Sequence, residues 1–370
     1  MSGGSSISGT SSSADRPLLI QVVPRLKPGR CGVSDQAVLI ARELNTAFGI
    51  DSAFAVLNSN EQSDLPYPTV YCPPTKLLET WRELTQGRVA AALVHVSGYG
   101  YSSDGAPTLL ADALEQVGAS VQLGTAAYFH EIFASGPPWK SVFWHTRRQK
   151  RALRRIVAQC GLIVTSIEHN AQWLESESRD LGEVPVERIP VFSAAGEAEA
   201  PLPFAQRNPT MAVFGLAGTR QLAYRQLAAT KDLIRTLGIE EILDVGPECQ
   251  SPSALNGVPV KPMGPLPAVE LPAVLSRARF GFVTHEWSYF ARSSVLAAYC
   301  AQGTIPVLIG PIPGPADGLT DGVQVVSPQT AEAARRSGWE TCSQAAWSWY
   351  MGHRLRVHAE RYAQWIGERR

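Results

Sequence analysis

The sequence predicts an α/β protein with two doubly wound domains in succession. Apolar runs of strand length alternate with amphipathic segments of helix length, which is typical of mainly parallel sheets covered on both faces. The alternation stops once, from Ala195 to Pro209, where small residues and prolines show no periodicity, and then restarts. A length of 370 residues is also more than one such domain usually needs.

The chain opens with a strand, a loop and a helix. Leu18 to Val23 predicts a buried strand, and the following loop holds three basic residues, Arg25, Lys27 and Arg30. A helix is expected from Ser34, with Ser34 or Asp35 as its cap, and Gly49 is expected to end it before a second strand. A basic, glycine-containing loop before a helix N-terminus favours an anionic ligand there.

The later elements are predicted from the same periodicities. In the first domain, strands are expected at Val89 to Val96, Val121 to Phe129, Gly161 to Ser166 and Arg188 to Phe192. The helices between them are expected at Thr108 to Val117, Ser141 to Gln159 and His169 to Leu174. In the second domain, strands are expected at Met211 to Phe214, Glu241 to Val245, Phe280 to Thr284 and Ile305 to Ile309. Its helices are expected at Gln221 to Leu237, Val269 to Ala278 and Ser293 to Gln302.

These elements divide the chain into five parts. The prediction is a disordered tail at 1–15, a first domain at 16–196, a linker at 197–209, a second domain at 210–341 and a C-terminal helix at 342–370. The last segment has an apolar side, so it is expected to form one long helix that docks back against one or both domains.

Composition excludes several classes of protein. The 33 basic residues balance the 33 acidic ones, so no overall field recruits nucleic acid or a membrane surface. The cysteines lie far apart without a C-x-x-C pair, which argues against a zinc site and a disulfide framework. The first residues lack the features of a signal peptide, and no apolar run reaches membrane-spanning length. A cytoplasmic protein without a transmembrane segment is expected, and its oligomeric state stays open.

Four segments together resemble a glycosyltransferase of the GT-B fold. They are Pro24 to Asp35, His95 to Tyr101, Phe129 to Glu131, and Ser293 to Val307. The closest likeness is to the retaining family 4 (glycosyl transferases group 1). The resemblance implies two Rossmann-like domains facing each other across a cleft, the first binding the acceptor and the second the nucleotide-sugar donor. It also implies glycan biosynthesis, a small-molecule or glycan acceptor, and no metal or cofactor.

The donor-binding residues are expected in the second domain. In the resembled enzymes a basic pair grips the diphosphate, which points here to Arg220 and Arg225, although both could equally lie on a solvated helix face. Arg292, Ser293 and Ser294 precede a helix, where the positive end of its dipole can bind a phosphate. From the first domain, Gly32 is expected to bring backbone amide groups toward the same donor.

The remaining candidates follow strands of the first domain. His130 is expected to bind a sugar hydroxyl or position the acceptor, with Glu131 orienting it. The aromatic rings of Tyr99 and Tyr101 could stack on a sugar or simply pack a loop, and Arg30 is expected to contact the acceptor.

One family feature is incomplete in this sequence. Members of the resembled family usually have two glutamates separated by seven residues, the second of which contacts the nucleotide ribose. Glu286 could be the first, as a catalytic residue, but Ser294 then stands in the second position. Counting back from Gly303 instead gives Phe290 and Ala298.

Two other functions fit parts of the pattern. The incomplete acidic pair favours a catalytically inactive GT-B-like protein that binds a nucleotide or glycan as a sensor or assembly subunit. A nicotinamide-dependent dehydrogenase is disfavoured, because no G-x-G-x-x-G follows the first strand.

Overall fold

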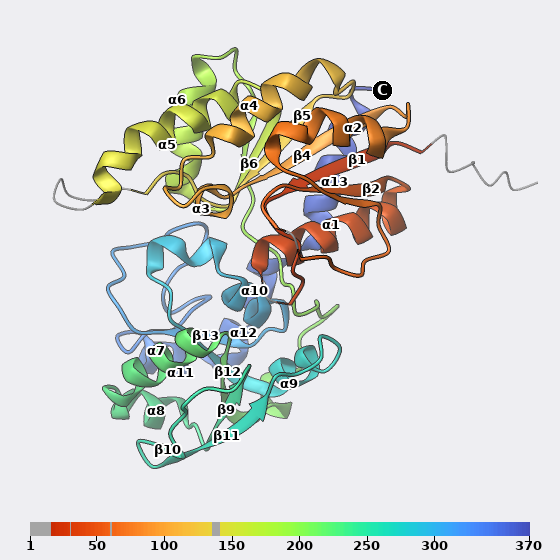
Figure 1. Ribbon diagram of the computed structural model, residues 1–370. Coiled ribbons are helices and arrows are strands. Elements are labelled where there is room, and N and C mark those ends of the chain that lie inside the picture. Colours follow the sequence, from red (N-terminus) through yellow and green to blue (C-terminus); the bar gives the residue numbers. More distant parts are fainter. Residues whose placement is uncertain (1–15, 30, 60, 135–140) are drawn as a thin grey trace, which may run out of the picture. The chain divides into compact units, whose positions relative to one another are not determined.

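The computed structural model describes residues 16–29, 31–59, 61–134 and 141–370 and divides into two compact units (Figure 1). Unit 1 contains the chain up to Val164 together with Leu174–Glu187 and Ala359–Arg370, and unit 2 contains Thr165–Trp173 and Arg188–His358. The chain therefore passes between the units at several points, and the predicted linker at 197–209 belongs to unit 2.

Unit 1 is built on a seven-stranded sheet with the order β3-β2-β1-β4-β5-β6-β7. The strands are β1 (Leu18–Val23), β2 (Asp51–Val56), β3 (Thr69–Tyr71), β4 (Ala90–Val96), β5 (Thr125–Phe129), β6 (Cys160–Thr165) and β7 (Val186–Arg188). β1 pairs in parallel with both β2 and β4, so the chain winds outward from β1 in two directions. The carboxyl ends of β1 and β4 form a topological switch point, where ligands usually bind in such sheets.

The helices that follow these strands are α1 (Gly32–Phe48), α2 (Leu77–Thr85), α3 (Gly98–Tyr101), α4 (Thr108–Val117), α5 (Ser141–Val157) and α6 (Glu168–Arg179), and α13 (Leu355–Gly367) comes near the C-terminal end of the chain. Short 3-10 turns lie at Pro74–Lys76 and Gly118–Ser120. α6 and α13 both begin in unit 2 and end in unit 1.

The start of α1 differs from the prediction. Cys31, not Ser34 or Asp35, is the N-cap residue of this helix. The Ser34 hydroxyl instead donates to the Arg25 carbonyl at 3.0 Å and accepts from Lys27 N at 2.9 Å, while Asp35 accepts from Gly29 N at 2.6 Å. The polar side chains of the first turn therefore hold the preceding loop. Gly49 ends the helix as predicted, in the left-handed conformation at φ 66°.

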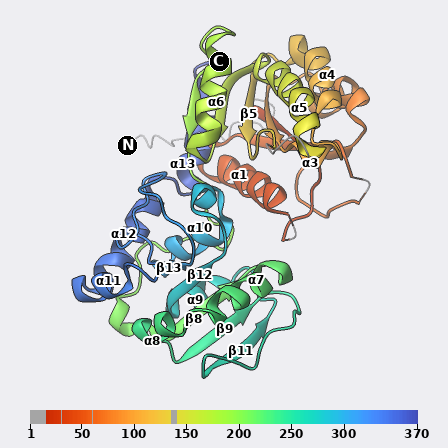
Figure 2. The same ribbon diagram turned by 90° about the vertical axis from the view of Figure 1, so that its left-hand side faces the viewer.

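Unit 2 is built on a six-stranded sheet with the order β10-β11-β9-β8-β12-β13 (Figure 2). Its strands are β8 (Asn208–Phe214), β9 (Glu241–Val245), β10 (Ala254–Leu255), β11 (Val258–Gly264), β12 (Ala278–Val283) and β13 (Ile305–Leu308). All pair in parallel except β10, which forms an antiparallel hairpin with β11. The sheets confirm the predicted α/β class with two doubly wound halves.

The helices of unit 2 are α7 (Ala217–Ala228), α8 (Lys231–Leu237), α9 (Leu271–Arg277), α10 (Ser294–Ala301), α11 (Ala331–Ser337) and α12 (Trp339–Met351). Two 3-10 helices lie at Phe204–Gln206 and Trp287–Arg292. In the described part of the chain, no helix is long and apolar enough to cross a membrane.

Three elements differ from the prediction. The helix expected over Gln221 to Leu237 is two helices, α7 and α8, and the segment 342–370 also contains two, because α12 ends at Met351 and α13 begins at Leu355. The glycine at 352 in this break has a low helix propensity. The strand expected at Arg188 to Phe192 is limited to the end of β7, since Pro190 has no N–H to donate to a sheet.

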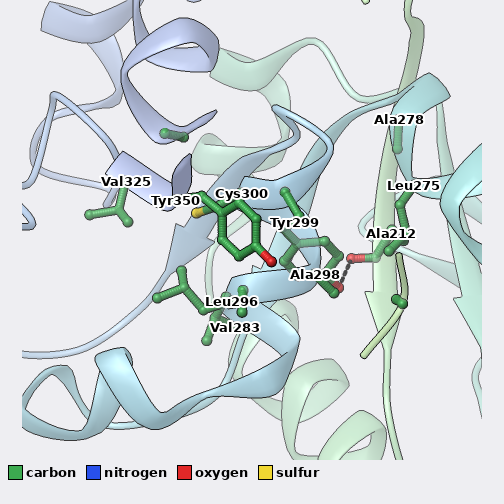
Figure 3. Packing of buried hydrophobic residues seen from close by; sticks show 14 of the residues in the cluster. Ala212, Leu275, Ala278, Val283, Leu296, Ala298, Tyr299, Cys300, Val325 and Tyr350 are labelled. Carbon is green, nitrogen blue, oxygen red and sulfur yellow. Dashed lines mark hydrogen bonds between the residues drawn. The ribbon is translucent and has the colours of Figure 1, made fainter. Parts of the chain in front are cut away.

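Tyr299 anchors α10 in the core of unit 2 (Figure 3). Its hydroxyl donates to the carbonyl of Ala212 at 2.9 Å and accepts from the amide of Phe214 at 3.2 Å. Its ring covers Gly281, where an added Cβ would lie 2.5 Å from ring atoms. These contacts hold α10 against β8 and β12.

Candidate functional site

The carboxyl ends of β8, β9 and β12 meet at one edge of the unit 2 sheet, because these strands are parallel neighbours. β8 comes first in the chain but lies between the other two, so the switch point of this sheet is at the ends of β8 and β12. The loops that begin there start at Gly215 and Thr284.

Two helix N-termini approach Gly215. A Cβ at this glycine, which has a φ of 136°, would lie 3.6 Å from the Thr219 side chain of α7 and 3.8 Å from Val295 of α10. Among the described residues, no side chain caps the first turn of α7, so its amide groups keep their donors for a ligand. The positive ends of two helix dipoles at one glycine favour an anion there.

Ser293 links the start of α10 to His285. The Ser293 hydroxyl accepts from the Leu296 amide at 3.2 Å and lies 3.2 Å from His285 Nδ1. Partial burial of the ring and the positive charge of Arg292 lower the pKa of His285, so the neutral ring is favoured and can accept the hydroxyl proton. Arg292 itself is exposed, and its guanidinium lies 5.3 Å from the centre of the Tyr289 ring.

Arg220 is buried at the same edge rather than exposed to solvent. Its Nη1 donates to Asp244 at 2.6 Å, and its Nε donates to the carbonyl of Gly215 at 3.0 Å. Tyr224 also donates to Asp244, and Gly246 lies so close that a Cβ there would be 2.9 Å from Arg220 Nε. Nη2 is buried without a hydrogen-bond partner among the described residues, which leaves its N–H groups for a ligand that reaches this loop.

Arg225 lies apart from Arg220 in role and environment. It is exposed. Because it lies five residues after Arg220 on α7, its side chain leaves the helix on a different side from the buried Arg220 side chain. The two arginines of the predicted basic pair therefore have different environments, because Arg220 is buried against Asp244 and Arg225 is exposed.

The two possible positions of the acidic pair differ in exposure. Phe290 and Ala298 are each 1% exposed and pack in the core, so counting back from Gly303 leads to residues that cannot reach a ligand. Glu286 and Ser294 are both exposed, one just after β12 and the other at the first position of α10. The structure thus leaves Glu286 and Ser294 as the two ligand-accessible positions.

In unit 1, His130 follows β5 at the carboxyl edge of the sheet. Its ring Nε2 lies 3.1 Å from Nδ1 of His95, whose Nε2 lies 2.8 Å from the side-chain oxygen of Gln21. His95 is fully buried, which lowers its pKa to about 3. Glu131 accepts a hydrogen bond from Ser97 at 2.8 Å. The structure thus shows His95 in contact with His130, a pairing that the sequence did not predict.

The other predicted residues of this unit have different environments. The Tyr101 hydroxyl donates to the main-chain carbonyls of Val22 and His95, at 3.3 and 3.2 Å, and burial raises its pKa well above the ordinary value. Tyr99 is 47% exposed, and Gly32 is exposed at the first position of α1. Arg30 lies outside the described residues.

A hollow of about 320 Å³ lies beside the carboxyl ends of β2 and β3 and was not predicted. It is lined by Leu57, Asn58, Ser59, Tyr71, Cys72 and Pro73. The Asn58 side chain donates to the carbonyl of Gly100 at 2.7 Å, which ties the hollow to α3. No motif marks these residues, and the three-residue β3 is too short for a periodicity signal.

No protein-family model matches this sequence, and no curated protein matches it significantly. Solved structures do resemble it. One is an alpha-glucosyltransferase in complex with UDP and a 13-mer DNA, at 12% identity and a TM-score of 0.56, covering 95% of this chain and 99% of that one. Another is a sucrose-phosphate synthase from Thermosynechococcus elongatus, at 14% identity and a TM-score of 0.59, covering 95% and 98%. A glycosyltransferase from Rickettsia africae has 12% identity and a TM-score of 0.60, covering 96% and 99%.

Similarity at this level of identity establishes the fold. The chain has the GT-B fold, with two Rossmann-like α/β units, and it spans nearly the whole of these glycosyltransferases.

Proposed function

We propose that this protein is a glycosyltransferase that moves a sugar from a nucleotide-diphosphate sugar to a hydroxyl acceptor, with retention and without a metal ion. The observation that supports this most is the convergence of the α7 and α10 N-termini on Gly215, at the switch point of the unit 2 sheet. That arrangement suits a diphosphate, which is the leaving group of such a transfer.

In this proposal the diphosphate binds the first-turn amide groups of α7 and α10. Arg292 is exposed beside Ser293 and supplies a mobile positive charge, and Arg225 supplies a second along α7. Fixed dipoles and cations of this kind stabilise the charge that develops on a departing diphosphate. Arg220 acts mainly by holding the Gly215 carbonyl, and its Nη2 can still donate to a ligand.

Glu286 and Ser294 complete the proposed donor site. The Glu286 carboxylate accepts hydrogen bonds from hydroxyl groups of the donor, and the Ser294 hydroxyl takes the place of the second glutamate at the ribose. A neutral hydroxyl binds a ribose more weakly than a carboxylate does, because hydrogen bonds to charged groups are the stronger ones. The nucleotide is therefore expected to bind weakly.

The acceptor side of the proposal uses unit 1. His130 binds a sugar hydroxyl at the end of β5, and the exposed ring of Tyr99 offers a stacking face. Gly32 allows the main chain of α1 to approach a substrate closely, since it has no side chain and nothing lies within 4 Å of its Cβ position. Arg30 is a further candidate for acceptor contact.

The proposal is tested by calorimetry with UDP, GDP and ADP, followed by transfer assays with the matching sugar donors. Acceptors should include simple sugars, glycans and DNA, because one structural neighbour was solved with DNA. Arg292→Ala should weaken binding of the preferred nucleotide about tenfold or more, since it removes a charge-assisted hydrogen bond. The matched control is Arg336→Ala on α11, which is also exposed. Nucleotide binding that is insensitive to Arg292→Ala and Arg225→Ala would refute the site.

A second candidate function is nucleotide or glycan sensing without catalysis. The specific observation in its favour is Ser294, a serine at the exposed position where a carboxylate is expected. Nucleotide binding without turnover, across the full panel of donors and acceptors, would support this function over transfer.

A further inference from the structure

We propose that His285 is a further phosphate-binding residue of the donor site, and that Ser293 positions it by fixing the ring proton on Nε2. The proposal deepens the function proposed above and rests on it for the identity of the ligand, a nucleotide diphosphate. His285 was not among the candidate residues that the sequence suggested.

A short turn with a buried interior brings the two residues together. His285 comes two residues after the end of β12, and Ser293 is the N-cap of α10. The 3-10 helix between them buries Trp287 and Phe290 in the core of unit 2. Trp287 Nε1 also donates to the carbonyl of Gly314 at 2.7 Å. The pairing of His285 with Ser293 is therefore supported by the packing of the turn that joins β12 to α10.

The Ser293 hydroxyl has one proton, and its surroundings decide where that proton goes. Oγ accepts from the Leu296 amide at 3.2 Å, which uses a lone pair and leaves the proton to be donated. Ser293 is 1% exposed, and its other side-chain hydrogen-bond partner in the described part of the chain is His285 Nδ1, 3.2 Å away. If Nδ1 carried a proton, the buried hydroxyl would lose its acceptor, which is unfavourable. Ser293 therefore donates to Nδ1.

This contact gives the neutral His285 ring one form. A ring nitrogen that accepts a hydrogen bond carries no proton, so the proton is on Nε2. Partial burial of the ring and the positive charge of Arg292 lower the pKa of His285, which favours the neutral ring. His285 is exposed whereas Ser293 is buried, so the ring edge away from Ser293 is the one that a ligand can reach. That edge presents an N–H donor.

A phosphate group matches this donor well. Its charged oxygens are strong acceptors, whereas a sugar hydroxyl both donates and accepts and would not need a fixed ring form. The amide groups of Ser294 and Val295 precede the first main-chain hydrogen bond of α10, which runs from Ala297 to Ser293. They offer donors at the same helix start, where the helix dipole also favours an anion. His285 Nε2 thus adds a side-chain donor to these main-chain donors.

The first test reads the protonation form of His285 by long-range proton–nitrogen NMR of histidine-labelled full-length protein, without a ligand and at about pH 8. His285 should carry its proton on Nε2. Ser293→Thr keeps both the hydroxyl and the helix cap, so it should preserve this form. Ser293→Asp also keeps the cap, but its carboxylate only accepts, so it should move the proton to Nδ1. The positioning role is overturned by a wild-type ring protonated on Nδ1, or by a form that is the same in Ser293→Asp and wild type.

The second test adds inorganic pyrophosphate, which is a diphosphate without a base or a sugar. The Nε2 signal of His285 should shift on saturation while the proton stays on that nitrogen. His285→Leu should weaken pyrophosphate binding about tenfold, because it removes a hydrogen bond to a charged group. His285→Gln keeps an N–H donor and should recover part of this loss. The control is His169→Leu on α6, since His169 is also exposed and belongs to unit 2.

Three results would each overturn the phosphate contact. They are an unchanged His285 signal at saturating pyrophosphate, pyrophosphate binding by His285→Leu that is as tight as in wild type, and no binding of pyrophosphate to the wild-type protein. If both tests succeed but no donor supports transfer, the transferase function fails while the phosphate contact and its positioning by Ser293 stand.

Discussion

Arg220 and Asp244 form a buried ion pair at the end of the unit 2 sheet, with Nη1 and Oδ1 2.6 Å apart and exposures of 1% and 3%. The same arginine also binds the carbonyl of Gly215, so the pair sets the shape of the loop where α7 begins. A residue that the sequence suggests as a phosphate ligand is thus first a structural support of the loop before α7.

Arg220→Ala should cost about 3–5 kcal/mol of unfolding free energy, because it leaves the Asp244 charge buried without a partner. Urea denaturation of the variant measures this loss. Arg225→Ala, on the same helix but exposed, should stay within about 0.5 kcal/mol of wild type. Equal stability of the two variants would show that the buried pair does not support the loop. Losses of activity in Arg220→Ala must therefore be compared with its folded fraction.

Gly281→Ala should destabilise unit 2 by about 1–3 kcal/mol. The added methyl group would lie 2.5 Å from the Tyr299 ring, whose hydroxyl holds β8 to α10. Gly218→Ala is the control, since nothing lies within 4 Å of its Cβ position and alanine favours the helix there. The melting temperature should fall in Gly281→Ala and rise in Gly218→Ala. An unchanged melting temperature in Gly281→Ala would contradict the packing of Tyr299.

Arg292→Ala should raise the pKa of His285. Partial burial of the ring is the main cause of the lowered pKa and remains in the variant, but the repulsion from the guanidinium is removed. An NMR titration of the His285 ring measures the change. The control variant Arg336→Ala should leave the pKa of His285 unchanged. If the pKa of His285 is the same in Arg292→Ala and wild type, Arg292 points away from the ring and from the proposed phosphate site.

Stability should fall steeply as the pH drops below about 6.5. Burial lowers the pKa of His95 to about 3, of His353 to about 3 and of His358 to about 4. Between these values and the ordinary pKa, the unfolded chain binds protons that the folded chain does not, so the unfolding free energy decreases with falling pH. Each group contributes up to about 1.4 kcal/mol per pH unit in that window.

Urea midpoints from pH 7.5 down to pH 5 would check this dependence. His358→Gln should reduce the slope, whereas His169→Gln should not, because His169 is exposed on α6. A midpoint that is flat across this range would contradict the burial of these histidines.

Much of the fold could be predicted because helix and strand periodicities are local. The bounds of β1, β9 and α4 match the prediction, and Gly49 ends α1 as expected. Short elements such as β3 and β10 were missed, since two or three residues cannot show a period. The part of the candidate site that could be predicted was its location after strands, not its internal contacts.

The sequence alone determined two successive strand–helix halves, their order and the residues that follow their strands. Only the tertiary structure decided which of those residues meet. Arg220 is paired with a residue 24 positions away, and His130 with one 35 positions away. Such partners depend on strand order and register, which bring distant segments together through packing of the whole sheet, whereas sequence periodicity reports only on neighbours within one element. For this reason Ser34 and Asp35, expected as a helix cap, instead hold the loop before α1.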